Sequence, residues 1–331
     1  MNRLMNTHSG ARHSYEQRLH DIRAFGGQAM SYSALQEGIR EFRHPAFDGF
    51  VPYQTVWGVD YVLSHPVTPA NQYLIATLLF LEHRRRVVLC QVSRNYASML
   101  SCLGLQVSPF GAEHIVPLSD FTVSWKKRRS LKRFCSRLAN QQYHVFENAG
   151  FARETHSVSR EWLAHKQNSR ELSFLARPFT DTDEPDVRTF YLIKQNRLLG
   201  FCTFDPVYAE GGDGRPVSYV LQHHRSVSDS PNGAGDYLLV SSLQQFRDEG
   251  IKEVSLGLSP LHDRADDSFL VPQGVRRLFD WLYGTKFLYH FEDLGRHKER
   301  FHGVKRQTYI AAYRKFTVRN LTGILKVNNL I

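Results

Sequence analysis

The sequence is poor in cysteine and has none of the cysteine spacings that hold a metal ion. Its 331 residues include four cysteines, and none of them form a C-x-x-C pair. Cys90, Cys102 and Cys202 lie in apolar stretches, whereas Cys135 lies in a basic one. Buried, reduced thiols are therefore predicted for the first three, and a zinc site is not expected.

The sequence also lacks an apolar run long enough to cross a bilayer. The longest one, Tyr73 to Leu81, is far shorter than the roughly 20 residues that a spanning helix needs, and the charged segment 82–86 follows it. Residues 1–45 are polar and contain no apolar stretch of the kind found in secretory signals. We expect a soluble, cytoplasmic protein, with a peripheral position at the inner membrane face as a further possibility.

Motifs for covalent or metal-dependent catalysis are missing as well. There is no G-x-S-x-G sequence, so an activated serine is not indicated. Sixteen histidines are present, but none has the spacing of a metal site. His223 and His224 are adjacent, so in a strand they would point to opposite faces and would not share one ion. No metal site is predicted.

Positive charge is what the sequence has in excess. Lysine and arginine total 42 against 32 aspartates and glutamates, which gives a formal net charge of +10. Such a surface attracts nucleic acid, anionic lipid or phosphorylated substrates, and charge alone does not choose among them.

Strand and helix patterns alternate along the chain and predict an α/β protein with two lobes. We expect a tail with short helices over residues 1–45, a first lobe over 46–150, a second lobe over 151–315 and an amphipathic segment over 316–331. Two short helices are expected within residues 14–43, separated at Gly26 and Gly27. Strands are predicted over 56–63, 86–92, 115–118, 187–194, 198–204, 217–222 and 251–256, and helices over 69–83, 95–103, 125–140, 162–171 and 235–247.

A strand, a glycine-containing loop and a helix follow one another over residues 218–250. This order aims free N–H groups and the positive end of the helix at an anion, as acetyltransferases do for the pyrophosphate of coenzyme A. The loop between Arg225 and Gly235 is longer than a compact pyrophosphate loop needs. An ordinary turn at the Pro-Asn-Gly sequence 231–233 explains the same residues equally well.

A strongly basic helix is predicted over residues 125–140. Six cations fall within nine residues without an intervening acid, and aromatic residues lie at both edges. This pattern favours a polyanionic partner over a simple solvated face, but separates RNA from anionic lipid only weakly. The candidate polyanion-binding cations are Lys126, Lys127, Arg128, Arg129, Lys132, Arg133 and Arg137.

Three segments together resemble a known family. They are Ser108 to Glu113 continuing through the basic helix to Asn140; Ser159 to Leu163 with Lys166, Glu171, Phe174 and the Gly200-Phe201 strand; and Arg225, residues 231–233, Leu256 to Leu261 and Tyr289 to Phe291 with Leu294, Lys298, Glu299 and Phe301. In this order they resemble the C-terminal catalytic domain of the bacterial phosphatidylglycerol lysyltransferases, the multiple peptide resistance factors. The resemblance covers roughly residues 50–315.

The resemblance implies two tandem acetyltransferase (GNAT)-like lobes, with mixed sheets flanked by helices. It implies an aminoacyltransferase that uses aminoacyl-tRNA as co-substrate, with no other cofactor. The tRNA acceptor end and the acceptor molecule would approach a tunnel between the lobes from opposite sides. Members of the family modify a glycerol hydroxyl of a lipid such as phosphatidylglycerol, and relatives modify other hydroxyl- or amine-bearing molecules.

Three residues are expected to be catalytic because they match polar positions of the family's site. Glu171 would hold the α-ammonium group of the donor, and Arg225 would face a phosphate or oxyanion. Lys298 would neutralise the tRNA 3′ end or the tetrahedral intermediate. Substrate-binding residues are expected at Lys166, Gln222, His224, Asn232, Gly233, Asp293 and Phe301.

The sequence departs from the family at two of these places. Gln222 replaces an acidic residue, which argues against lysine as the transferred amino acid if that acid recognises a cationic side chain. Asp293, Leu294 and Gly295 stand where the family has Gly-Leu-Arg, so another contact differs. The transferred amino acid and the acceptor are left open.

Two other functions fit the same residues. An acyl-CoA-dependent N-acyltransferase would share the fold, and a tRNA-binding relative without activity is compatible with Gln222. The C-terminal segment 316–331 is either a membrane contact or a helix packed on its lobe.

Overall fold

The computed structural model describes residues 15–331 except 83, 123–125, 148–149, 167–168, 181, 264–268, 270–272 and 285–290. Its helices are α1 (Tyr15–Phe25), α2 (Tyr73–Glu82), α3 (Arg94–Cys102), α4 (Arg129–Asn140), α5 (Ala152–Ala164), α6 (Ala234–Asp248), α7 (Gln273–Gly284), α8 (Phe291–Glu299) and α9 (Val318–Val327). Short 3₁₀ turns are η1 (Tyr32–Leu35), η2 (Ala70–Gln72) and η3 (Lys126–Arg128). The strands are β1 (Arg40–Phe42), β2 (Val51–Val56), β3 (Val59–Leu63), β4 (Val87–Val92), β5 (Gln106–Pro117), β6 (His144–Glu147), β7 (Arg188–Lys194), β8 (Arg197–Tyr208), β9 (Pro216–Ser226), β10 (Glu253–Pro260) and β11 (Val304–Ala312).

The strands form one mixed sheet that runs through both halves of the chain. Its order is β1-β2-β3-β4-β11-β5-β10-β9-β8-β7-β6. The pairs β3/β4 and β9/β10 are parallel, whereas β5 is antiparallel to both of its neighbours. Strand β11 lies between β4 and β5, so the chain returns from its second half to complete the first half of the sheet. The division into segments at residues 45, 150 and 315 stays a prediction.

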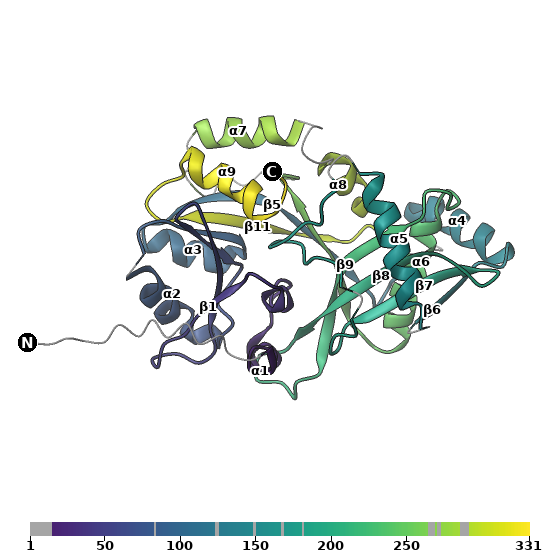
Figure 1. Cartoon of the computed structure of the whole chain (residues 1–331), viewed down its shortest axis with the longest axis horizontal. Helices are drawn as coiled ribbons and strands as arrows, with labels where there is room; N and C mark the ends of the chain where they lie inside the picture. The colour runs from purple at the N-terminus through teal and green to yellow at the C-terminus, as the bar shows by residue number, and fades with distance from the viewer. Residues whose placement is uncertain are drawn as a thin grey trace, which may run out of the picture.

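Both faces of the sheet are covered by helices in its first half. Strand β4 is buried along its whole length, and its alternate side chains enter different cores. Val88 packs with α9 on one face, whereas Val87 and Leu89 pack with α2 and α3 on the other. In the second half, α5 and α6 contribute to a separate core with β7, β8 and β9. Figure 1 shows α2 and α3 near one end of the molecule and α4, α5 and α6 near the other.

Most of the predicted elements are present, but two predicted helices are wrong. The second helix expected within residues 14–43 is the 3₁₀ turn η1 followed by strand β1. Every residue of η1 is buried, and residues 40–42 pair with β2, so this segment has no amphipathic helical face. The helix expected over 162–171 is instead α5, which begins at Ala152 and ends at Ala164.

The C-terminal segment forms helix α9, which packs on the sheet. Leu321, Ile324 and Val327 join the core that contains Tyr61 of β3. The Tyr61 hydroxyl donates a hydrogen bond to the carbonyl oxygen of Asn320 at 2.9 Å. Of the two alternatives for this segment, the packed helix is therefore the one observed.

Buried thiols are predicted at three cysteines, and the structure confirms two of them. Cys90 and Cys202 are buried, and burial raises the pKa of the Cys202 thiol to about 12. Cys102 is exposed because it ends α3 on the side that faces solvent, so the prediction was wrong there. Cys135 is half-buried.

Gly323 is required for α9 to approach β3. A Cβ atom at this position would lie 1.9 Å from the Tyr61 hydroxyl oxygen, and Tyr61 is fully buried. We expect Gly323→Ala to lower the free energy of unfolding by about 1–3 kcal/mol, as overpacking does, measured by urea denaturation. Gly274→Ala, in α7 with no atom within 4 Å of the added Cβ, is the control and should not destabilise. Adding Tyr61→Phe to Gly323→Ala should recover part of the loss; no loss in the single variant would contradict the packing.

Candidate active site

A cavity of about 490 Å³ lies where the two halves of the chain meet. Its walls come from the end of α5 and the following loop, from β9, β10, α8 and α9, and from Gln91 and Phe110 of the first half. Apolar side chains of α9, including Leu321, Ile324 and Leu325, form one wall. The predicted site residues that line it are Lys166, Glu171, Gln222, His224, Arg225, Asp293 and Lys298.

Arg225 and Glu171 form a bidentate ion pair in this cavity. The two guanidinium nitrogens of Arg225 donate to the carboxylate oxygens of Glu171 at 2.6 and 2.7 Å. One of them also donates to the Ser159 hydroxyl at 2.5 Å. Arg225 is only 5% exposed, whereas the Glu171 side chain is 29% exposed. The pair holds a buried positive charge in a fixed orientation and leaves one side of the carboxylate open to a ligand.

Trp162 of α5 brings a second cation next to this pair. The guanidinium carbon of Arg225 lies 4.8 Å from the centroid of the Trp162 ring, and the Lys166 ammonium lies 4.3 Å from it. Burial lowers the pKa of Lys166, and the charge of Arg225 lowers it further. Both cations thus rest on one indole ring, which stabilises them without neutralising their charge.

Lys298 enters the cavity from α8 and is almost fully buried. Its ammonium nitrogen donates to the carbonyl oxygen of Leu258 at 2.8 Å. That carbonyl follows a bulge in β10, where Gly257 has a φ of +79°, a conformation that glycine adopts without strain. Burial lowers the pKa of Lys298 to about 7, although the nearby Glu113 carboxylate acts in the opposite direction. A lysine of this kind exchanges a proton near neutral pH.

Gln222 and His223 of β9 fix the loop that carries the other side of the cavity. The Gln222 amide donates to the carbonyl oxygen of Arg177 at 3.0 Å, and His223 Nε2 lies 2.9 Å from the same oxygen. Arg177 itself forms a buried ion pair with Asp205 at 2.7 Å. Sequence reasoning missed Arg177, because an isolated arginine in a loop carries no recognisable pattern.

His224 points to a different part of the structure from His223. Its Nε2 lies 3.1 Å from the carbonyl oxygen of Gly235, and burial lowers its pKa to about 4. The opposite orientations of these histidines agree with their positions in a strand. In the part of the chain that the structure describes, no three His, Cys, Asp or Glu residues are placed to hold a metal ion.

Three predicted substrate-binding residues do not line the cavity. Phe301 is fully buried in the core of the second half. Gly233 precedes α6 with a φ of +83°, and a Cβ there would lie 2.4 Å from the Phe134 ring, so glycine allows α4 and α6 to pack. The Asn232 carbonyl accepts a hydrogen bond from Arg137. All three contribute to packing rather than to the cavity wall.

Helix α6 begins after a turn, and an acidic residue in its first turn compensates the positive end of the helix. The amide of Ala234 donates to the carbonyl oxygen of Pro231 at 3.0 Å, which is the hydrogen bond of an ordinary turn. Asp236 is buried in the first helical turn and pairs with Arg300 at 2.8 Å. Of the two interpretations of residues 231–233, the ordinary turn is therefore the one observed.

The basic helix is present as η3 and α4, and six of its seven candidate cations are exposed. Arg128 is the exception, being 2% exposed. Its guanidinium donates to the carbonyl oxygens of Phe301 and Thr122 at 2.9 and 3.1 Å, so it holds two segments together and does not present its charge to a polyanion at the surface. The cations that remain are Lys126, Lys127, Arg129, Lys132, Arg133 and Arg137. Trp125, Tyr289 and His290 lie outside the described residues.

In the described part of the chain, no helix is both long and apolar enough to cross a membrane.

Comparison with known proteins identifies relatives of the whole arrangement. The family model "Phosphatidylglycerol lysyltransferase, C-terminal" matches residues 20–312. The phosphatidylglycerol lysyltransferase of Staphylococcus haemolyticus is 24% identical over 85% of this chain, and that of Bacillus subtilis is 27% identical over 69%. The chain spans only 33% and 26% of the length of these relatives.

A solved structure supports the fold. "The structure of L-PGS from Bacillus licheniformis" superimposes with a TM-score of 0.77 over 95% of this chain and 96% of that one, at 23% sequence identity. The expected α/β fold, in which a mixed sheet is flanked by helices, is confirmed. The match to the family model covers most of the chain. The chain therefore belongs to the phosphatidylglycerol lysyltransferase C-terminal family.

Proposed function

We propose that the chain transfers an aminoacyl group from aminoacyl-tRNA to a hydroxyl or amine group of a small acceptor, namely phosphatidylglycerol or a similar lipid. The observation that carries the proposal is one cavity lined by a buried arginine, a second cation beside it and a lysine with a pKa near 7. The relatives are named phosphatidylglycerol lysyltransferases, which supports a lipid acceptor, while the transferred amino acid is left open. No cofactor is needed, because an aminoacyl ester is already activated.

The residues suit each stage of an ester-to-ester transfer. The neutral amine of Lys298 accepts the proton of the acceptor hydroxyl as its oxygen attacks the ester carbonyl carbon. Arg225 and Lys166 stabilise the negative charge that develops on the carbonyl oxygen. When the intermediate collapses, the bond to the ribose oxygen breaks, and the Lys298 ammonium returns the proton to that oxygen.

The remaining residues divide the cavity into a polar part and an apolar part. The exposed side of the Glu171 carboxylate is available to the α-ammonium group of the donor. Leu321, Ile324 and Leu325 of α9 give the cavity an apolar wall, which suits the glycerol and the first methylene groups of a lipid. The Gln222 amide donates a hydrogen bond to the Arg177 carbonyl oxygen. Because this amide is uncharged, it offers no counter-charge to the ammonium group of a lysyl side chain.

An acyl-CoA donor is disfavoured by the start of α6. The loop between Arg225 and Gly235 is longer than a compact pyrophosphate loop, and the ion pair of Asp236 with Arg300 already occupies the first turn of the helix. Calorimetric titration with coenzyme A distinguishes the two donors, because tight binding would favour the acyl-CoA reaction over the proposed one.

The activity is tested by incubating the purified chain with a full set of radiolabelled aminoacyl-tRNAs and phosphatidylglycerol dispersed in detergent. We expect label from at least one tRNA to move into the organic phase. Label that moves only into the aqueous phase would keep the donor but change the acceptor. No transfer from any tRNA, in the presence of a complete lipid and metabolite extract, would refute the proposed function.

The role of Lys298 predicts a particular dependence on pH. Because only the neutral amine accepts a proton, kcat/KM should rise as pH increases through about 7 and then level off. Lys298→Met should lower kcat/KM by about 100-fold, as expected for loss of a general base, and should abolish this rise. Lys252→Met, which removes an exposed lysine away from the cavity, is the control and should keep the wild-type profile. An unchanged profile in Lys298→Met would exclude this role.

The basic helix predicts how tRNA binding depends on salt. Replacing Lys126, Lys127, Arg129 and Lys132 with alanine should weaken tRNA binding and reduce the slope of log K against log salt by up to about 3, given roughly 0.7–0.9 per phosphate contact. The control removes four exposed cations elsewhere: Arg153, Arg160, Lys252 and Arg277. Filter-binding measurements over a range of salt compare the two variants. Equal slopes would show that net charge, and not this helix, attracts tRNA.

A further inference from the structure

Helix α2 has an apolar face that stays exposed among the residues that the structure describes. Its sequence, YLIATLLFLE, has a single charged residue. Ala76, Phe80 and Leu81 pack into the core of the first half. On the opposite side Leu74, Ile75 and Leu78 are 46%, 37% and 44% exposed, and their spacing places them in one stripe. A surface helix normally has polar residues on its outer face. An exposed apolar stripe therefore indicates contact with an apolar partner or with lipid.

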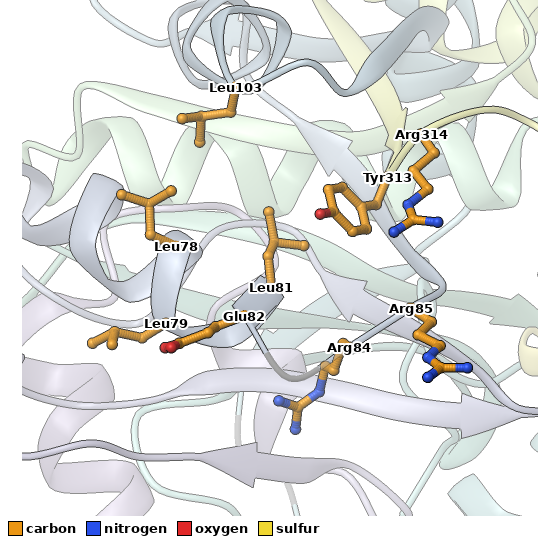
Figure 2. Close-up of a pocket in the computed structure, with 9 residues that line it drawn as sticks. All are labelled: Leu78, Leu79, Leu81, Glu82, Arg84, Arg85, Leu103, Tyr313 and Arg314. Carbon is orange, nitrogen blue, oxygen red and sulfur yellow. The ribbon is translucent and has the colours of Figure 1, made fainter.

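A pocket of about 620 Å³ lies beside this stripe. Leu78, Leu81 and Leu103 give it apolar walls, and Arg85 and Arg314 line it as well. Figure 2 shows Leu78 on one side of the pocket and the two guanidinium groups on the other. The pocket therefore combines an apolar part with a cationic part.

The cations gather there because two strand ends lie side by side. The amide of Tyr313 donates to the Val87 carbonyl oxygen at 2.9 Å, so the end of β11 lies against the start of β4. The exposed cations at these ends are Arg85, Arg86, Arg314 and Lys315. One acid, Glu82, also lines the pocket.

Arg84 has a different role from its neighbours. Its guanidinium carbon lies 3.9 Å from the centroid of the Phe80 ring, and it pairs with Asp60 at 3.1 Å. It therefore fixes α2 to the sheet, while the exposed cations next to it face solvent.

We propose that this surface, formed by Leu74, Ile75, Leu78, Arg85, Arg86, Arg314 and Lys315, docks on an anionic phospholipid bilayer. The apolar side chains enter the boundary between headgroups and acyl chains, and the cations bind lipid phosphates. An RNA would use the cations but leave the stripe in water. An apolar protein partner would cover the stripe but leave the cations without counter-charges, whereas an anionic bilayer satisfies both.

This docking goes beyond the proposed function and does not depend on the transfer reaction. It concerns a surface that is separate in residues from the cavity lined by Arg225 and Lys298. If the acceptor is a lipid, docking holds the chain at the surface where that lipid is concentrated.

Vesicle flotation, with no tRNA present, tests the proposal. The chain should bind vesicles of phosphatidylglycerol and phosphatidylcholine at least tenfold more strongly than vesicles of phosphatidylcholine alone, and binding should fall as salt increases. The triple variant Leu74→Gln, Ile75→Gln and Leu78→Gln should reduce binding by at least tenfold without lowering the melting temperature, because these side chains are exposed. Arg85→Gln with Arg314→Gln should weaken binding and flatten its salt dependence.

The matched control places glutamine at three exposed apolar positions elsewhere, namely Phe146, Val217 and Val304. It should bind vesicles as the wild type does. Failure of the wild type to bind anionic vesicles, or wild-type binding by the α2 triple variant, would overturn the proposal. So would a dimer in light scattering that the α2 triple variant converts to a monomer, since a second copy would then cover the stripe.

The two proposals fail separately. If the transfer reaction is absent but vesicle binding depends on α2, the docking surface stands without the proposed function. If the reaction occurs, the α2 triple variant should still modify short-chain phosphatidylglycerol dissolved as monomers at the wild-type rate. A loss there would place α2 in the catalytic unit and overturn docking as its role.

Discussion

The pairing of β5 with β11 on one side and β10 on the other is the constraint on which the rest of the structure depends. Residues 106–117 come from the first half of the chain, and both partners come from the second half. Because these backbone hydrogen bonds join the halves into one sheet, the lobes cannot separate without breaking them. The cavity lies at this junction, so its opposing walls are held by the sheet. The bulge at Gly257, which directs the Leu258 carbonyl toward Lys298, is a local irregularity in that pairing.

Charge in the cavity is controlled by what each ionisable group touches. The buried Arg225 guanidinium has a carboxylate, a hydroxyl and an indole ring as neighbours. Lys298 has one carbonyl oxygen and a more distant carboxylate, so burial lowers its pKa. Arg225 and Lys298 thus suit different tasks in one cavity: Arg225 suits the stabilisation of negative charge, and Lys298 suits the acceptance of a proton.

The sequence predicted the alternation of elements because strands such as β4 and helices such as α3 carry strong local patterns. It did not predict which residues meet across the sheet, since contacts such as that between Gln222 and the Arg177 carbonyl depend on long-range pairing. The resemblance placed Glu171, Arg225 and Lys298 at a site, and the structure brings these residues into one cavity. Their roles remain predictions. Arg128 and Phe301 look like site residues in the sequence but are buried for packing, because composition does not distinguish a buried cation from an exposed one.

The position of α9 has a consequence for how the molecule acquires its site. Leu321, Ile324 and Leu325 form a wall of the cavity, and β11 completes the centre of the sheet only shortly before them in the chain. During synthesis, every earlier strand has emerged before these elements exist. The cavity is therefore among the last parts of the fold to close. A chain interrupted before residue 304 would carry the whole basic helix together with Arg225 and Lys298, but it would lack strand β11 and the α9 wall of the cavity.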